Sequence, residues 1–283
     1  MMPLLLNIEF LEMQKISVLG CGWLGLPLSQ KLIESGFVVK GSTTSSEKVS
    51  QLEDAGINPF VVSLTENSIE GSVEAFLDES EVLIINIPPK LRSGSTENFV
   101  AKIEILIQFL EKSSIKKVLF VSSTSVYGNQ EGILTEEIIP EPITESGKQL
   151  LQVEKLLLTN PNFKTTILRF GGLIGEDRHP VKHLAGKENL DNPDAPINFI
   201  HQKDCIEIIK TICSNELIEV WGETFNAVAP FHPSRKDYYV QKAKEMNLAL
   251  PKFSESIEST IKIIASDKLI KRIGHQFDLD LYR

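Results

Sequence analysis

The sequence predicts an α/β fold in which a doubly wound parallel sheet is followed by a smaller C-terminal lobe. Two observations lead to this prediction. Short apolar runs alternate with segments of helical periodicity through roughly the first 170 of the 283 residues. A glycine-rich turn joins the first apolar run to the first helical segment. Because parallel strands need crossover connections, this alternation implies helices on both faces of the sheet and ligands at the carboxyl ends of the strands.

The glycine-rich turn reads Leu-Gly-Cys-Gly-Trp-Leu-Gly, with the Gly-x-Gly-x-x-Gly spacing at Gly20, Gly22 and Gly25. The first glycine permits a tight turn, the second lets the backbone approach a pyrophosphate, and the third lets the helix pack close to the strand. The N–H groups and the positive dipole end of the helix then face the phosphates. The turn, which includes Trp23 and Leu24, predicts a Rossmann-type dinucleotide site. A purely structural glycine turn is the alternative.

The elements follow in order along the first part of the chain. The run at 81–87 is almost wholly apolar, as expected of a strand covered on both faces. Pro142 is expected in the first turn of its helix. Strands are predicted at 15–19, 37–43, 59–64, 81–87, 117–122 and 165–170, and helices after Gly25 and at 47–55, 72–78, 97–112 and 142–158.

Two domains are expected, because the alternation loosens beyond Gly175, where prolines separate short elements. Residues 15–174 would form the dinucleotide-binding domain, and residues 175–283 a smaller substrate lobe. Residues 197–228 of that lobe are expected to pack back on the first domain. The short elements are expected at 197–201, 202–212, 225–228, 234–246 and 266–273.

The first fourteen residues contain no Lys or Arg, and Glu9 and Glu12 interrupt their apolar run. A signal peptide needs a basic start and an uninterrupted apolar core, so residues 1–14 are interpreted as a loose leader. Met13 is then a candidate for the functional start. No apolar run is long enough to span a membrane.

Composition narrows the choice of partners and compartment. A formal net charge of -9 argues against nucleic acid, which would need a basic surface. Cys21, Cys205 and Cys213 lack the spacing of a disulfide framework or a zinc site, which favours the reducing cytoplasm. The expected partners are a dinucleotide and a small-molecule substrate, without nucleic acid or membrane. Both a monomer and a homodimer remain open.

The end of the second strand bears on cofactor preference. A carboxylate there would bind the adenosine ribose and repel a 2′-phosphate. The position holds Thr43, in Gly-Ser-Thr-Thr-Ser-Ser followed by Glu47 and Lys48. The hydroxyls and Lys48 could hold a 2′-phosphate, although no Arg is present to clamp it. NADP is therefore slightly favoured over NAD. A solvated turn with an ordinary helix cap is the alternative.

Residues 121–128 read Val-Ser-Ser-Thr-Ser-Val-Tyr-Gly. With the glycine-rich turn, this segment resembles the extended short-chain dehydrogenase/reductase superfamily of the NAD-dependent epimerase/dehydratase type. The resemblance runs from about Lys15 to the C-terminus. The motifs at 20–28, 122–128, 175–180 and 185–187 look like those of the atypical YeeZ-like subgroup, which is known mainly by its fold and a presumed nucleotide site. Further matches lie at 136–142, 168–180, 185–187 and 198–204.

The resemblance implies a set of catalytic residues. Active relatives place a Ser or Thr four residues before the tyrosine of Val-Tyr-Gly, which here is Ser123, to polarise the substrate. They also carry Tyr-x-x-x-Lys on the next helix, where the lysine binds the nicotinamide ribose. The lysine position holds Lys148, but the tyrosine position holds Thr144. A threonine hydroxyl is far too weak an acid to replace a phenol of pKa about 10, so the usual proton relay is missing.

Two other tyrosines are candidates to replace the missing catalytic tyrosine. Tyr127 is expected to be a packed residue under the turn. Tyr238 and Lys242 also spell Tyr-x-x-x-Lys, but on a late helix, where they are interpreted as an accidental surface pair. Arg178 could neutralise an anionic substrate, as the resemblance suggests.

A metal site is not expected. His179 and His183 lie four residues apart, but Pro180 falls between them and no third ligand is in register.

Two hypotheses therefore stand. The first is an NAD(P)-binding oxidoreductase of the epimerase/dehydratase type, acting on an unknown small substrate with Ser123, water or the substrate itself managing the proton. The second is a non-catalytic NAD(P)-binding sensor or scaffold, which Thr144 favours. The sequence does not decide whether the protein is an enzyme.

Overall fold

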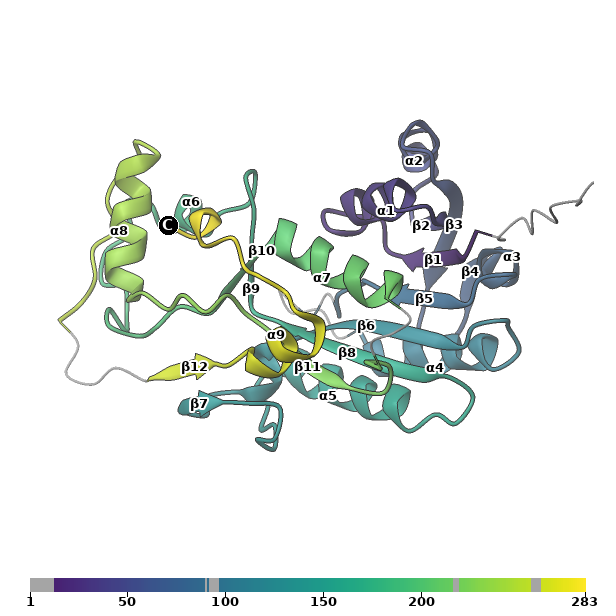
Figure 1. The fold of residues 1–283 in the computed structure, drawn as a ribbon. Helices are drawn as coiled ribbons and strands as arrows, with labels where there is room; N and C mark the ends of the chain where they lie inside the picture. Colours follow the sequence, from purple (N-terminus) through teal and green to yellow (C-terminus); the bar gives the residue numbers. More distant parts are fainter. Residues whose placement is uncertain (1–12, 90, 92–96, 216–218, 256–260) are drawn as a thin grey trace, which may run out of the picture.

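The computed structural model describes residues 13–89, 91, 97–215, 219–255 and 261–283. Its centre is an eight-stranded sheet in the order β11-β8-β6-β5-β1-β2-β3-β4 (Figure 1). The strands are β1 (Lys15–Leu19), β2 (Val38–Thr43), β3 (Asn58–Leu64), β4 (Ile69–Gly71), β5 (Val82–Ile85), β6 (Lys117–Ser123), β8 (Lys164–Phe170) and β11 (Thr224–Ala227).

All neighbouring strands of this sheet are parallel except β4, which runs antiparallel to β3 at one edge. The middle strands are buried on both faces, as the apolar run of β5 requires. The predicted doubly wound α/β fold is confirmed. Its last strand, β11, comes from the C-terminal part of the chain and pairs with β8.

Helices cover both faces of the sheet (Figure 1). One face carries α1 (Gly25–Glu34), α2 (Val49–Asp54), α7 (Gln202–Ser214) and α9 (Asp267–Ile273). The other carries α3 (Val73–Leu77), α4 (Phe99–Leu110) and α5 (Glu145–Leu158).

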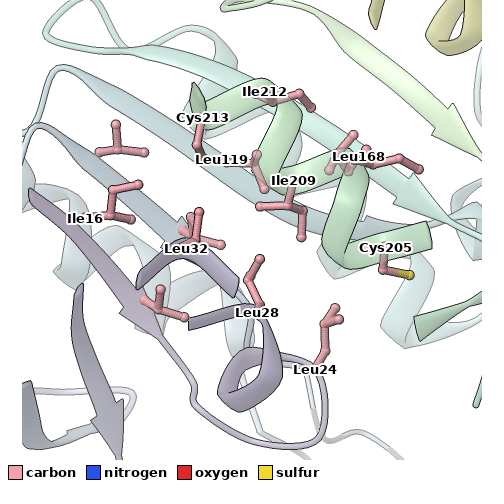
Figure 2. Close-up of a cluster of buried hydrophobic side chains, with 14 of the residues drawn as sticks. Ile16, Leu24, Leu28, Leu32, Leu119, Leu168, Cys205, Ile209, Ile212 and Cys213 are labelled. Atoms are coloured by element: carbon pink, nitrogen blue, oxygen red, sulfur yellow. The ribbon is translucent and has the colours of Figure 1, made fainter. Parts of the chain in front are cut away.

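Figure 2 shows how the first face is filled: Leu28 and Leu32 of α1 point toward Ile209 of α7 above the strands. The side chains of all three are fully buried. Burying one such side chain contributes about 1.5–3 kcal/mol to folding, so the contact between α1 and α7 ties the C-terminal part of the chain to the first half.

The smaller elements lie beyond the carboxyl edge of the sheet. They include two short parallel pairs, of β9 (Gly172–Ile174) with β10 (Phe199–His201) and of β7 (Gly132–Leu134) with β12 (Lys262–Ile264). Helices α6 (Val181–Leu184) and α8 (Arg235–Glu245) pack on each other.

Short 3₁₀ turns in the described parts of the chain are η1 (Ser46–Lys48), η2 (Thr124–Tyr127) and η3 (Leu279–Leu281).

Several predicted boundaries need correction. The helix expected at 142–158 begins at Glu145, because Thr144 has extended backbone and its hydroxyl caps the first turn. The helix expected at 47–55 divides into η1 and α2.

The expected leader lies mostly outside the described residues. Gln14, however, is held: its carbonyl accepts a hydrogen bond from the Val38 N–H at 3.2 Å. Among the described residues, no helix has the length and apolar character needed to cross a bilayer.

Candidate functional site

The strand order changes direction between β1 and β5. From β1 the chain builds outward through β2 and β3, and then returns to build β5, β6 and β8 on the other side. The loops after β1 and β5 therefore lie at the switch point of the strand order, at the carboxyl edge of the sheet, which is the usual ligand position in such folds. The glycine-rich turn is the loop that follows β1.

The three glycines of the turn meet different surroundings. Gly20 has φ +103°, and a Cβ there would lie 2.6 Å from the Asn86 carbonyl oxygen. A Cβ on Gly25 would lie 2.1 Å from the Gly20 carbonyl oxygen. Among the described residues, nothing lies within 4 Å of a Cβ added to Gly22. The first and third glycines are thus required by packing, whereas the second faces open space.

Helix α1 begins beside that open space. Its N-cap residue, Leu24, has no oxygen in its side chain and makes no side-chain cap. In the first turn the Leu26 N–H already donates to the Gly22 carbonyl oxygen at 3.0 Å and Pro27 has no N–H, so the positive dipole end of α1 is what the helix offers a pyrophosphate. The open side of Gly22 and the uncapped helix start together fit the phosphates of a dinucleotide.

Two polar side chains that the sequence did not indicate hold the turn in place. The Ser42 hydroxyl at the end of β2 accepts a hydrogen bond from the Gly20 N–H at 2.9 Å. The Asn86 amide donates to the Gly20 carbonyl oxygen at 3.0 Å. Asn86 is a polar residue in the apolar run of the fourth predicted strand, and this departure from the run is the sequence feature that could have pointed to it.

Trp23 ties the turn to the C-terminal part of the chain. Its indole N–H donates to Asp177 at 2.8 Å, and the Arg178 guanidinium lies 4.9 Å from the ring centroid. The Trp23 carbonyl oxygen accepts from the Gln202 amide at 2.6 Å. Gly175 lies under the indole, where a Cβ would be 2.7 Å from a ring carbon. Arg178 is therefore placed beside the glycine-rich turn.

The residues considered for the adenosine ribose lie at the end of β2. Thr43 is buried, and its hydroxyl accepts from the Ser45 N–H at 3.2 Å. Thr44, Ser46 and Lys48 are exposed beside it. The exposed groups, more than Thr43 itself, are thus open to a 2′-phosphate.

Ser123 ends β6 and starts the turn η2. Its side chain is half-buried, and its hydroxyl accepts from the Ser125 N–H at 3.1 Å. The same turn packs on the start of α5, since a Cβ on Gly147 would lie 2.9 Å from the Ser125 carbonyl oxygen. Gly147 therefore allows the close approach of α5 to η2.

Thr144 and Lys148 lie one turn apart at the start of α5. The Thr144 hydroxyl accepts a hydrogen bond from the Gly147 N–H at 3.1 Å, and its carbonyl accepts from the Lys148 N–H at 3.0 Å. Thr144 is thus a helix N-cap. Lys148 is exposed on the first turn of α5.

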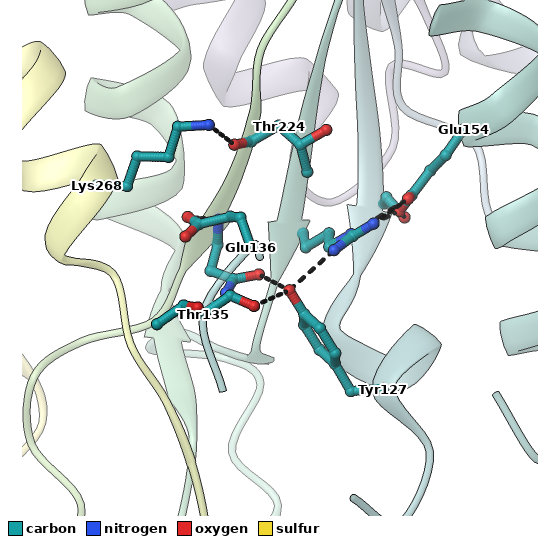
Figure 3. A network of polar contacts seen from close by, with 9 residues as sticks. Tyr127, Thr135, Glu136, Glu154, Thr224 and Lys268 are labelled. Carbon is teal, nitrogen blue, oxygen red and sulfur yellow. Dashed lines mark hydrogen bonds and ion pairs between the residues drawn. The ribbon is translucent and has the colours of Figure 1, made fainter. Parts of the chain in front are cut away.

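Tyr127 is fully buried beneath η2 (Figure 3). Its hydroxyl accepts from the Arg169 guanidinium at 2.8 Å and lies 3.0 Å from the Asn226 amide oxygen and 3.1 Å from the Thr135 carbonyl oxygen. Burial raises the pKa of this phenol above its ordinary value. Arg169 continues the network to the buried carboxylate of Glu154.

Tyr238 is buried, and in this respect the interpretation of Tyr238 and Lys242 as a surface pair is wrong. The Tyr238 hydroxyl lies 3.0 Å from His179 Nε2, and α8 packs Tyr238 against α6. His179 Nδ1 accepts from the Val181 N–H at 3.2 Å. The Lys242 ammonium pairs with Glu245 at 2.7 Å. The Tyr-x-x-x-Lys spacing here thus serves the packing of α8.

His183 is exposed. Within the described ranges of the chain, no group of three His, Cys, Asp or Glu side chains is placed to hold a metal ion.

Comparison with known proteins gives a consistent result. Residues 20–198 match the family model described as NAD(P)H-binding. Protein YeeZ of Escherichia coli (strain K12) is 31% identical over 268 residues, which cover 94% of this chain and 96% of the relative.

Solved structures share the fold. A putative NAD-dependent epimerase/dehydratase from Methylobacillus flagellatus superposes with TM-score 0.74 at 25% identity, over 95% of this chain and 96% of that one. UDP-glucuronic acid 4-epimerase from Bacillus cereus, in complex with NAD, gives TM-score 0.75 at 19% identity, over 93% and 91%. The chain therefore belongs to the NAD(P)H-binding family and is a homologue of Protein YeeZ.

Proposed function

We propose that this chain is a cytoplasmic NAD(P)-dependent oxidoreductase of the epimerase/dehydratase type. The dinucleotide would lie on Gly20, Gly22 and Gly25, with Trp23 and Leu24 beside its phosphates. The observation that supports this most is the contrast at the glycine-rich turn. Two glycines are required by packing, while Gly22 faces open space that packing alone does not explain.

The rest of the site is proposed around that turn. Residues 15–174 would bind the dinucleotide and residues 175–283 the substrate. Lys148 would hold the nicotinamide ribose, and Ser123 would donate a hydrogen bond to the reacting oxygen of the substrate. Arg178, stacked on Trp23, would offset the charge of an anionic substrate.

When bound, the nicotinamide supplies hydride transfer. The residues of this chain would bind and orient the substrate and move a proton. The Ser123 hydroxyl oxygen accepts one hydrogen bond within its own turn, and its O–H could donate to a substrate oxygen. Thr144 cannot act as the acid, so the proton would pass through Ser123, through water or within the substrate.

The cofactor and its preference can be tested by thermal-shift titration with NAD, NADH, NADP and NADPH. Binding to the native state raises the midpoint of unfolding by an amount that grows with the logarithm of ligand concentration above the dissociation constant. We expect such shifts, and a lower dissociation constant for NADPH than for NADH, because Thr44, Ser46 and Lys48 are exposed and β2 ends in Thr43 rather than in a carboxylate. A lower dissociation constant for NADH would reverse the preference.

Catalysis is tested by Ser123→Ala. The first substrates to try are UDP-glucuronic acid and UDP-glucose, because solved structures with the same fold are described in complex with them. Simple carbonyl compounds follow. We expect dinucleotide-dependent turnover that falls at least tenfold in the variant, in the range of general acid catalysis. Full activity in Ser123→Ala would remove this residue from the mechanism.

The rival function is a non-catalytic NAD(P)-binding sensor or scaffold. It is favoured by Thr144, whose hydroxyl is occupied as a helix cap. A Thr144→Tyr variant distinguishes the two. Gained turnover would indicate a site that lacks only its acid, whereas tight dinucleotide binding with no turnover in either form would favour the sensor.

A further inference from the structure

Lys262 is a half-buried lysine that none of the proposed roles uses. It is the first residue of β12, and its ammonium donates to the Gly128 carbonyl oxygen at 2.7 Å. Gly128 directly follows η2, the turn that Ser123 begins. A residue near the C-terminus thus reaches the loop at the carboxyl end of β6.

The loop that Lys262 reaches packs against the start of α5. Gly128 has φ +55°, and a Cβ there would lie 2.1 Å from the Glu141 carbonyl oxygen. Three residues after Glu141, Thr144 caps α5, whose first turn packs on η2 through Gly147. Lys262 is therefore attached to the same packed unit that carries Ser123 and Thr144.

The backbone of Lys262 is fixed from the other side. Asn198, just before β10, donates from its amide to the Lys262 carbonyl oxygen at 2.8 Å and accepts from the Ile264 N–H at 2.8 Å. The Asn198 carbonyl accepts from the Gly172 N–H at 2.8 Å, beside β9. Lys262 thus lies where the small C-terminal elements meet the end of β6, with its main chain held in one position.

No carboxylate in the described parts of the chain pairs with the Lys262 ammonium. Other well-covered lysines do have such a partner: Lys102 and Lys242, with side chains 14% and 15% exposed, pair with Glu97 and Glu245.

Lys40 is a closer comparison, since within the described ranges its ammonium also donates to carbonyl oxygens and to no carboxylate. It donates to the carbonyl oxygens of Ala75 and Asp78, and the carboxylates of Asp78 and Glu79 counter the lowering of its pKa by burial. For Lys262, burial lowers the pKa of the ammonium, and no carboxylate of the described residues opposes this shift.

An ammonium has three N–H donors, and Lys262 uses one of them on Gly128. A covered positive charge without a counter-ion costs free energy that an incoming anion would recover. We propose that Lys262 binds a negatively charged group of the substrate, a carboxylate or a phosphate, and so selects anionic substrates at the end of β6. This inference rests on the proposed function, which seats the substrate in front of Ser123.

The test uses small anions as probes and thermal unfolding as the measurement. Malonate supplies carboxylates, inorganic phosphate supplies phosphate, and sodium chloride of equal ionic strength is the background. Lys262→Met keeps the apolar stem and removes the charge, and Lys262→Arg restores the charge. Lys187→Met is the matched control, because Lys187 is an exposed lysine of the C-terminal part.

We expect at least one of the two anions to raise the unfolding midpoint of the wild type above the chloride background. The anion concentration that raises the midpoint by a fixed amount should increase at least tenfold in Lys262→Met and stay within twofold of wild type in Lys262→Arg and Lys187→Met. The anion that acts identifies the group that is bound. If Lys262→Met does not fold, Lys262→Gln is measured in its place.

No shift above chloride in the wild type, an unchanged response in Lys262→Met, or an equal loss in Lys187→Met would each overturn the inference. Each titration is run with and without saturating NADPH, which separates the two proposals. A chain that binds no dinucleotide refutes the proposed function, whereas the loss of the anion response in Lys262→Met can be measured without dinucleotide and tests Lys262 by itself.

Discussion

The guanidinium of Arg169 and the carboxylate of Glu154 form a buried ion pair that joins β8 to α5, with 2.6 Å between Arg169 Nη2 and Glu154 Oε2. Their side chains are 7% and 2% exposed. The Ser122 hydroxyl also donates to Glu154, and Arg169 donates to the Tyr127 hydroxyl (Figure 3). The pair therefore holds together β6, β8, α5 and the turn after Ser123.

Removing one member of this buried pair should lower the free energy of unfolding much more than removing one member of an exposed ion pair. Glu154→Gln leaves a buried guanidinium without its counter-ion, so we expect the free energy of unfolding to fall by about 3–5 kcal/mol in urea titrations. Glu188→Gln, which breaks the exposed pair with Lys252, should leave the free energy of unfolding nearly unchanged. Equal effects of the two variants would show that the network around Tyr127 does not stabilise the fold.

The cap role of Thr144 predicts a stability cost that is independent of any chemistry. Thr144→Ala removes the acceptor of the Gly147 N–H and should lower the free energy of unfolding by about 1 kcal/mol. Thr144→Ser keeps the hydroxyl and should match the wild type. Thr144→Tyr also loses the cap, so its turnover must be measured below its own unfolding temperature. A Thr144→Ala variant as stable as Thr144→Ser would contradict the role.

His179 predicts a pH dependence of stability. Burial lowers its pKa from 6.5 to about 4, the charges of Lys242 and Lys182 act in the same direction, and Glu245 opposes them. The unfolded chain therefore binds the proton more tightly, so this contribution is present above pH 6.5 and is lost as the pH falls toward 4. Its ring also stacks on Tyr238.

The measurement is the free energy of unfolding between pH 7 and pH 4. The wild type should lose stability more steeply than His179→Gln over this interval, while His183→Gln, which changes an exposed histidine, should keep the wild-type slope. Parallel profiles for the wild type and His179→Gln would exclude the effect.

Local patterns in the sequence predicted the long elements well, and contacts between distant residues account for what they missed. The apolar run of β5 and the helical period of α4 are properties of single segments. Strands β7 and β12 have three residues each and exist because they pair with each other across more than a hundred residues. Their sequences alone contain no period long enough to detect.

The same distinction applies to the candidate site. The glycine spacing is local, and it led to the turn after β1. The bonds from Ser42 and Asn86 to Gly20, and from Lys262 to Gly128, join segments that are far apart in the chain. Thr144 was identified as a departure from the family pattern, but its role as a cap depends on backbone geometry that the sequence does not specify.

The dinucleotide is proposed to lie against Gly22, and Gly22→Ala is the sharpest test of that position. No described residue lies within 4 Å of a Cβ at this position, so the added methyl group should leave the unfolding midpoint without ligand unchanged. The methyl group would occupy the space through which the pyrophosphate approaches the backbone. In calorimetric titrations with NADPH and NADH, we expect saturable binding to the wild type and at least tenfold weaker binding to Gly22→Ala. Equal affinity in the two proteins, or no binding to the wild type, would contradict the account.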